Sequence, residues 1–194
     1  MRISLRTTLL ASTLTLVTTL GTAPAHATTT TASTGLAPKD QARAADNAIT
    51  CRGGSLHAHF NPSVMFQQHP IQVQATGDLS ACTSLRNPNR TGGRFSLSGS
   101  GTGTCANQFA VGSGKLHISW NDGTTSTIAQ TNFRFEAATW SFDGGRVSER
   151  EFKGQTARAN GRSTRSAVEM SAECLTSGLN SYTGAVGTFT IGSV

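Results

Sequence analysis

Apolar and polar residues alternate along much of the chain after residue 50. Leu56, Ala58 and Phe60 alternate with His57 and His59. A period of two is typical of a β-strand that buries one face and exposes the other. The pattern recurs at 71–76, 94–98, 116–120, 133–135, 168–174 and 189–191. We predict a half-buried strand in each segment, because no long segment has the period of a helix.

Turn motifs separate these segments. Asn-Asp-Gly at 121–123 and Asp-Gly-Gly at 143–145 each stand between two strand-like runs, which predicts two β-hairpins. Counting the runs between such breaks predicts about eight or nine short strands. We therefore expect an all-β fold, an antiparallel β-sandwich of the Greek-key type. Trp140 and Phe142 have the opposite parity to Phe133 and Phe135. This parity change requires either a β-bulge or burial on both faces.

The chain begins with the pattern of a signal peptide. Arg2 and Arg6 precede an uncharged stretch from 7 to 25, and Ala25-His26-Ala27 places small residues where a signal peptidase cuts. We predict a signal peptide at 1–27, with cleavage after Ala25 as the alternative. A membrane anchor is less favoured, because the stretch is rich in Thr and Ser and a span needs roughly 20 strongly apolar residues.

Cleavage after position 27 leaves 167 of the 194 residues, and it lowers the net charge from +6 to +4. We expect residues 28–50 to be a polar, disordered leader and residues 51–194 to be a single secreted domain. No later segment is apolar enough to span a membrane, so we expect a soluble mature protein. Leu, Ile, Val and Phe supply only 29 of the 167 residues, and such a thin core favours covalent cross-links.

Four cysteines lie in the mature region: Cys51, Cys82, Cys105 and Cys174. In an exported chain they predict two disulfides, for which three pairings are possible. We favour the sequential pairing, in which the first cysteine joins the second and the third joins the fourth. No C-x-x-C pair is present, which disfavours a structural zinc site.

Four stretches give the chain a familiar layout. They are Cys-Arg-Gly-Gly at 51–54, Ala-Thr-Gly-Asp-Leu-Ser-Ala-Cys-Thr-Ser at 75–84, Gly-Ser-Gly-Thr-Gly-Thr-Cys at 99–105 and Leu-His-Ile-Ser-Trp-Asn-Asp-Gly at 116–123. With the signal peptide, this layout resembles a group of small secreted actinobacterial proteins that carry no assigned activity. The resemblance implies a secreted, disulfide-bonded β-sandwich, and it supplies no catalytic residues.

Motifs for catalysis or nucleotide binding are weak. The glycine-rich run at 99–104 is not followed by a helix, so we interpret it as glycines within strands rather than as a phosphate-binding loop. No G-x-S-x-G motif is present. Ten acidic residues are available, but nothing selects a pair for glycoside hydrolysis. The sequence therefore favours a non-enzymatic role.

Histidines are the candidate metal ligands. His57 and His59 share one face of a strand, and His69 or His117 could supply a third ligand for zinc. The alternation turns His57 and His59 away from the core, so we expect no metal and no other cofactor. His117 could join the pair only if its strand neighbours theirs.

Basic residues gather late in the chain. Arg158, Arg162 and Arg165 lie in a stretch without acidic residues, which we interpret as a solvated loop between strands. The functional alternative is an anion-binding site that docks on an anionic cell-wall polymer. Nucleic acid is disfavoured, because no aromatic side chains are interspersed to stack on bases.

We therefore expect a secreted binding or structural protein of the cell surface or extracellular medium. The sequence does not identify its partner; the candidates are an anionic cell-wall polymer and an extracellular protein. The alternatives are a secreted hydrolase, either metal-dependent or carbohydrate-active, and a protease inhibitor. An inhibitor would present the disulfide-braced segment 82–105, with Asn-Pro-Asn-Arg at 87–90, to the protease.

Overall fold

The structure is a computed structural model that describes residues 47–106 and 108–192. The predicted signal peptide at 1–27 and positions 28–46 of the predicted leader lie outside the described residues. All elements discussed below belong to the compact unit of residues 36–194.

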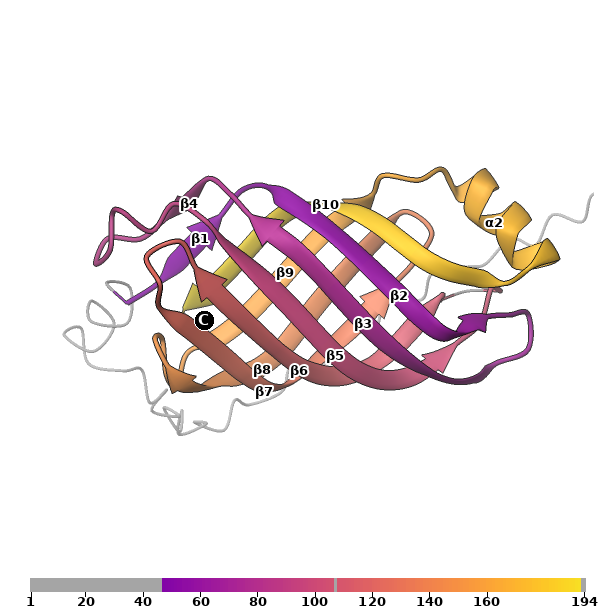
Figure 1. The fold of residues 1–194 in the computed structure, drawn as a ribbon, viewed down its shortest axis with the longest axis horizontal. Helices are drawn as coiled ribbons and strands as arrows, with labels where there is room; N and C mark the ends of the chain where they lie inside the picture. Colours follow the sequence, from indigo (N-terminus) through magenta and orange to yellow (C-terminus); the bar gives the residue numbers. More distant parts are fainter. Residues whose placement is uncertain (1–46, 107, 193–194) are drawn as a thin grey trace, which may run out of the picture. The chain divides into compact units, whose positions relative to one another are not determined.

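Ten strands and one helix follow one another along the described chain (Figure 1). The strands are β1 (Ile49–Cys51), β2 (Gly54–Val64), β3 (His69–Leu79), β4 (Cys82–Thr83), β5 (Gly93–Gly103), β6 (Ala110–Trp120), β7 (Thr125–Phe135), β8 (Thr139–Arg150), β9 (Thr156–Ser163) and β10 (Leu179–Gly192). The helix is α2 (Ala167–Thr176), which lies between β9 and β10.

Eight of the strands close into an antiparallel barrel. They follow the order β2-β3-β5-β6-β7-β8-β9-β10, and β10 pairs back onto β2 from Leu179 opposite Val64 to Ala185 opposite Ser55. The short strands β1 and β4 extend the sheet beyond β10. The predicted Greek-key β-sandwich is therefore wrong. The alternation reports one buried face per strand, and a sandwich and a barrel share that feature.

Aromatic side chains on the inner face pack inside the barrel. The ring of Phe135 lies 5.6 Å from Phe60 and 5.2 Å from Tyr182, and Trp140 lies 5.0 Å from Phe142. Glycines on neighbouring strands make room for the indole. A Cβ at Gly161 would lie 2.5 Å from Trp140, so a larger residue there would clash. The barrel interior is thus a packed core.

Tyr182, the one tyrosine of the chain, gives a direct probe of this core. Its side chain is fully buried, and its hydroxyl has no hydrogen-bond partner among the described residues. Burial raises the pKa of Tyr182 to about 12. Because the unfolded chain releases this proton near pH ~10, the stability that the neutral phenol confers is lost as the pH rises from ~10 towards ~12.

We expect the ultraviolet absorbance of tyrosinate to titrate with a midpoint near pH ~12 in the folded protein and near ~10 in denaturant. Tyr182→Phe should abolish the signal and should reduce the stability loss at alkaline pH. This substitution should lower the stability little at neutral pH, because the hydroxyl has no hydrogen-bond partner among the described residues. A folded-state midpoint near ~10, with near-ultraviolet circular dichroism intact, would contradict the burial of this side chain.

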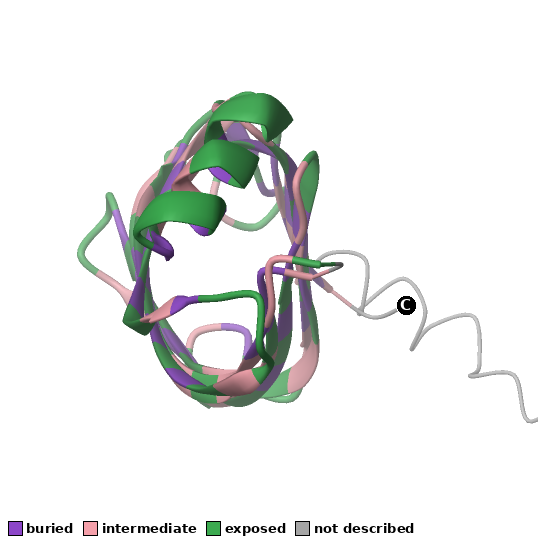
Figure 2. Ribbon diagram, turned by 90° about the vertical axis from the view of Figure 1, so that its right-hand side faces the viewer, coloured by how far each residue is buried: buried purple, intermediate pink, exposed green. Residues whose placement is uncertain are grey.

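The segment 168–174 forms helix α2, so the predicted strand there is wrong. Ser166 caps the helix: its hydroxyl accepts a hydrogen bond from the Glu169 amide, and the Glu169 carboxylate accepts one from the Ser166 amide. Met170 and Cys174, one helical turn apart, are the buried residues of α2, whereas Val168 is 80% exposed. Figure 2 shows α2 across one end of the barrel. The capping box at 166–169 was the sequence signal for this helix.

Two turn motifs behave differently. The motif at 121–123 joins β6 to β7, so the first predicted hairpin is confirmed. The motif at 143–145 lies within β8, where the register shifts between Asp143 and Arg146, so the second predicted hairpin is wrong. Gly144 and Gly145 have φ values of 75° and 84° and form a bulge. The change of parity between Phe135 and Trp140 arises at the connection between β7 and β8.

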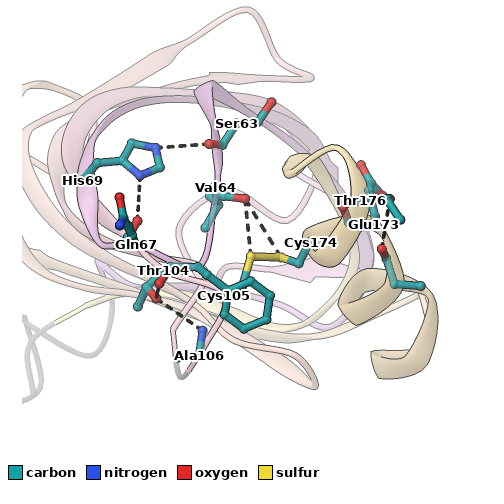
Figure 3. The surroundings of a disulfide bond; sticks show 12 residues. Ser63, Val64, Gln67, His69, Thr104, Cys105, Ala106, Glu173, Cys174 and Thr176 are labelled. Atoms are coloured by element: carbon teal, nitrogen blue, oxygen red, sulfur yellow. Dashed lines mark hydrogen bonds between the residues drawn. A yellow bond between two sulfur atoms is a disulfide. The ribbon is translucent and has the colours of Figure 1, made fainter.

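Both predicted disulfides are present, with the sequential pairing that we favoured. Cys51 joins Cys82 between the paired strands β1 and β4. Cys105 joins Cys174 and thereby ties the connection between β5 and β6 to helix α2. Figure 3 shows this second bond beside the carbonyl oxygen of Val64, which lies 3.4 Å from the sulfur of Cys105.

Arg90 closes the barrel end opposite α2. Its side chain is 2% exposed, and its guanidinium donates to the Asp122 carboxylate at 2.7 and 2.9 Å and to the Thr124 hydroxyl at 2.9 Å. It also lies 5.6 Å from the ring of Trp120 and 5.1 Å from that of Phe152. Arg90 is the arginine of the segment 87–90 that a protease inhibitor would present. Its side chain is buried in the barrel, so it is not accessible to a protease.

Candidate functional site: a groove over strands β7 to β10

Arg158 and Arg162 lie on strand β9, so the predicted loop at 158–165 is wrong for most of its length. Ala157, Ala159 and Gly161 face inward on β9, and the arginines alternate with them on the outer face. The inward residues are small, so the segment lacked the large apolar side chains on which a strand prediction depends.

The three predicted anion-binding arginines do not form one site. Arg165 lies in the connection to α2, where its guanidinium donates to the Glu173 carboxylate at 2.5 Å and to the Ser181 carbonyl at 3.3 Å. Arg158 lies 3.6 Å from Asp143. Arg162 forms no ion pair with any residue that the structure describes. Of the three, Arg162 is the one without a carboxylate partner among the described residues.

A β-bulge in β10 forms the floor of a groove beside Arg162. Val186 pairs with Gly161 and Thr188 with Asn160, so Gly187 has no opposite residue on β9. The buried Trp140 indole donates to the carbonyl of Ala185 at 3.3 Å, just before the bulge. Because Gly187 has no side chain, the outer surface is hollow at this point.

Polar side chains from three strands surround this floor. Arg134, Ser141 and Asn160 lie in one row across β7, β8 and β9, and Thr139 and Arg162 lie opposite each other in the next row. We call the hollow, of about 460 Å³, the bulge groove. It is lined by Arg134, Glu136, Thr139, Trp140, Ser141, Asn160, Gly161, Arg162, Ala185, Val186 and Gly187.

The two arginines of the bulge groove stand far enough apart to bracket a ligand. Arg134 and Arg162 are two strands and two residues apart, which corresponds to about 12 Å between their Cα atoms. Arg134 lies 3.7 Å from Glu136, but both side chains are well exposed. An exposed ion pair of this kind contributes little to stability, so Arg134 can exchange Glu136 for a ligand carboxylate or phosphate. The groove therefore offers two guanidinium groups against one carboxylate.

The histidines are not brought together in this way. His57 and His59 point outward from β2, as the alternation predicted. His117 lies on β6, and β3 and β5 separate it from β2, with Thr76 and Ser96 in the row between His57 and His117. Three strand spacings separate the Cα atoms of His57 and His117 by about 14 Å. The condition for His117 to join the pair is thus not met.

His69 has a structural position. Its two ring nitrogens lie 2.9 Å from the Gln67 carbonyl oxygen and 3.1 Å from the Ser63 carbonyl oxygen (Figure 3). These contacts tie together the connection between β2 and β3. Among residues 47–106 and 108–192, no group of three His, Cys, Asp or Glu side chains is placed to hold a metal ion.

Sequence reasoning found Arg162 but missed the rest of the bulge groove. Arg134, Ser141 and Asn160 come from three strands and meet only through the register of the sheet. The available signal was the parity of Arg134, which stands between Phe133 and Phe135 and therefore faces outward. No local sequence pattern predicts the bulge at Gly187.

Comparisons with protein-family models, with curated proteins and with solved structures found no match to this chain. The fold and the bulge groove are therefore the basis for a functional argument. Within the described part of the chain, no helix has the length and apolar character needed to cross a membrane.

Proposed function

We propose that the chain is a secreted, non-enzymatic protein that binds an anionic polymer outside the cell through the bulge groove. The predicted signal peptide supports export, and two disulfides are typical of proteins in oxidising compartments. The observation that carries the proposal is Arg162, an exposed cation without a carboxylate partner among the described residues, at the edge of a groove that also contains Arg134.

A site on the outer surface is favoured over one inside the barrel. Large aromatic side chains such as Phe135, Trp140 and Tyr182 pack against their neighbours in the interior. An outer groove can also accept a segment of a long polymer, because both ends of the segment remain free to continue into solvent.

We expect the protein to bind soluble polygalacturonate or poly(glycerol phosphate), and Arg134→Gln/Arg162→Gln to weaken that binding at least tenfold. Each charge-assisted hydrogen bond contributes about 1.5–3 kcal/mol, so losing two can account for that factor. Binding should also weaken with added salt. Isothermal titration calorimetry at two salt concentrations would measure both effects.

The matched control is Arg52→Gln/Lys115→Gln, which removes the same charge from exposed positions outside the bulge groove. It should bind nearly as well as the native protein. If this control loses as much affinity as the groove variant, the attraction is a general effect of net charge and the proposed site is wrong.

A further inference from the structure

We infer that the bulge groove recognises a uronic acid residue, so that the polymer is an acidic polysaccharide rather than a polyphosphate. This inference rests on the proposed function, because it names the chemical class that the same groove would bind. Three features of the groove carry it: an apolar floor, a single excess positive charge, and hydrogen-bonding side chains at the edge.

The floor suits the C–H face of a sugar ring. Gly161 and Gly187 have no side chains and Ala185 has only a methyl group, so sheet backbone and one methyl group form a largely apolar surface. The volume of about 460 Å³ lies within the range of small-molecule sites, which is about 300–1,000 Å³. A flexible polyphosphate chain has no flat apolar face to place on this floor.

The charge of the groove suits one carboxylate per binding site. Arg162 has no ion-pair partner among the described residues, whereas Arg134 lies 3.7 Å from Glu136. A guanidinium binds a carboxylate through two parallel hydrogen bonds. A polyphosphate would favour a row of cations along the groove, but the next arginine on the outer face of β9, Arg158, lies outside its lining.

The remaining polar groups can bind sugar hydroxyls. Ser141 and Asn160 lie opposite each other across β8 and β9, and both side chains can donate and accept hydrogen bonds. The Thr139 hydroxyl donates to Glu136 at 3.1 Å and so holds that carboxylate at the edge of the groove. There the carboxylate can accept a hydrogen bond from a ligand hydroxyl.

The test compares three short oligomers by isothermal titration calorimetry: oligogalacturonate, neutral oligogalactose and oligo(glycerol phosphate). We expect oligogalacturonate to bind at least tenfold more tightly than either of the others. Arg162→Gln should remove most of this preference for the acidic sugar. Gly187→Leu, which fills the groove without changing the charge, should abolish binding of oligogalacturonate.

Two further variants keep the test decisive. Ala185→Leu also fills the floor of the groove, from an exposed position on β10. It replaces Gly187→Leu in the test if that variant does not fold. Ser100→Leu adds the same side chain to the exposed face of β5, outside the groove, and should bind normally. If oligo(glycerol phosphate) binds as tightly and only the arginine variants weaken it, the proposed function stands and the uronate inference fails. If none of the three binds, both fail.

Discussion

Replacing Cys105 and Cys174 together by alanine is expected to lower the free energy of unfolding by about 4 kcal/mol. The bond joins residues 69 positions apart, and a cross-link over a long loop restricts the unfolded chain most strongly. It also cross-links α2, a helix whose surface is largely exposed, to the connection between β5 and β6. Equilibrium unfolding in urea, monitored by tryptophan fluorescence, would measure the loss.

The matched comparison is Cys51→Ala/Cys82→Ala, whose cysteines are 31 positions apart. The shorter loop predicts a slightly smaller loss of stability. Hydrogen exchange should separate the local consequences, because amides of α2 should lose protection only when the Cys105–Cys174 bond is removed. Unchanged protection of α2 in that variant would show that non-covalent contacts suffice to hold the helix.

Arg90→Ala is expected to cost about 3 kcal/mol of stability, because it removes the packing of a buried side chain and charge-assisted hydrogen bonds that contribute about 1.5–3 kcal/mol each. The guanidinium binds Asp122 and Thr124 and packs against the rings of Trp120 and Phe152. Arg94→Ala is the control. Arg94 lies 3.3 Å from Asp78, but its side chain is 88% exposed, so we expect less than about 1 kcal/mol there. Equal losses for the two variants, measured by urea unfolding, would refute a structural role for Arg90.

Acid unfolding provides a second readout of the Arg90 contact. Partial burial raises the pKa of Asp122, but hydrogen bonds from Thr124 and Arg90 and the charge of Arg90 outweigh this effect and lower it from 3.8 to about 2. A lowered pKa stabilises the fold above pH 3.8, and this contribution is lost as the pH falls towards 2. Without Arg90, the pKa of Asp122 should return towards its usual value. The loss of stability between pH 3.8 and 2 should then be smaller in the Arg90→Ala variant.

The sequence predicted some side-chain positions correctly because their signals were local. The parity of β2 placed His57 and His59 outward, and the structure agrees. Arg162 stood out because its stretch of the chain lacks acidic residues. Arg134 and Asn160 join Arg162 only because β7, β8 and β9 pair in one particular register. A single sequence does not determine which residues of three strands lie opposite one another.

Competing local signals explain two of the wrongly predicted elements. The segment 168–174 alternates apolar and polar residues as a strand would, yet the Ser166 cap and the burial of Met170 and Cys174 one turn apart favour a helix. The motif at 143–145 has the composition of a hairpin turn, but the pairing of β8 with β7 and β9 continues on both sides of it. The one extra residue on β8 relative to β9 is accommodated as a bulge.

The sequence by itself determined the all-β character, the inward and outward faces of most strands, the turn at 121–123 and the presence of two disulfides. These depend on the period of side chains along a strand, on turn chemistry and on cysteine count, which are local properties. Only the tertiary structure decided that the sheet closes through β10 and β2, and that a bulge opposite Gly161 opens a groove between Arg134 and Arg162. Both depend on hydrogen bonds between residues far apart in the chain, whose register is set by the packing of the whole core.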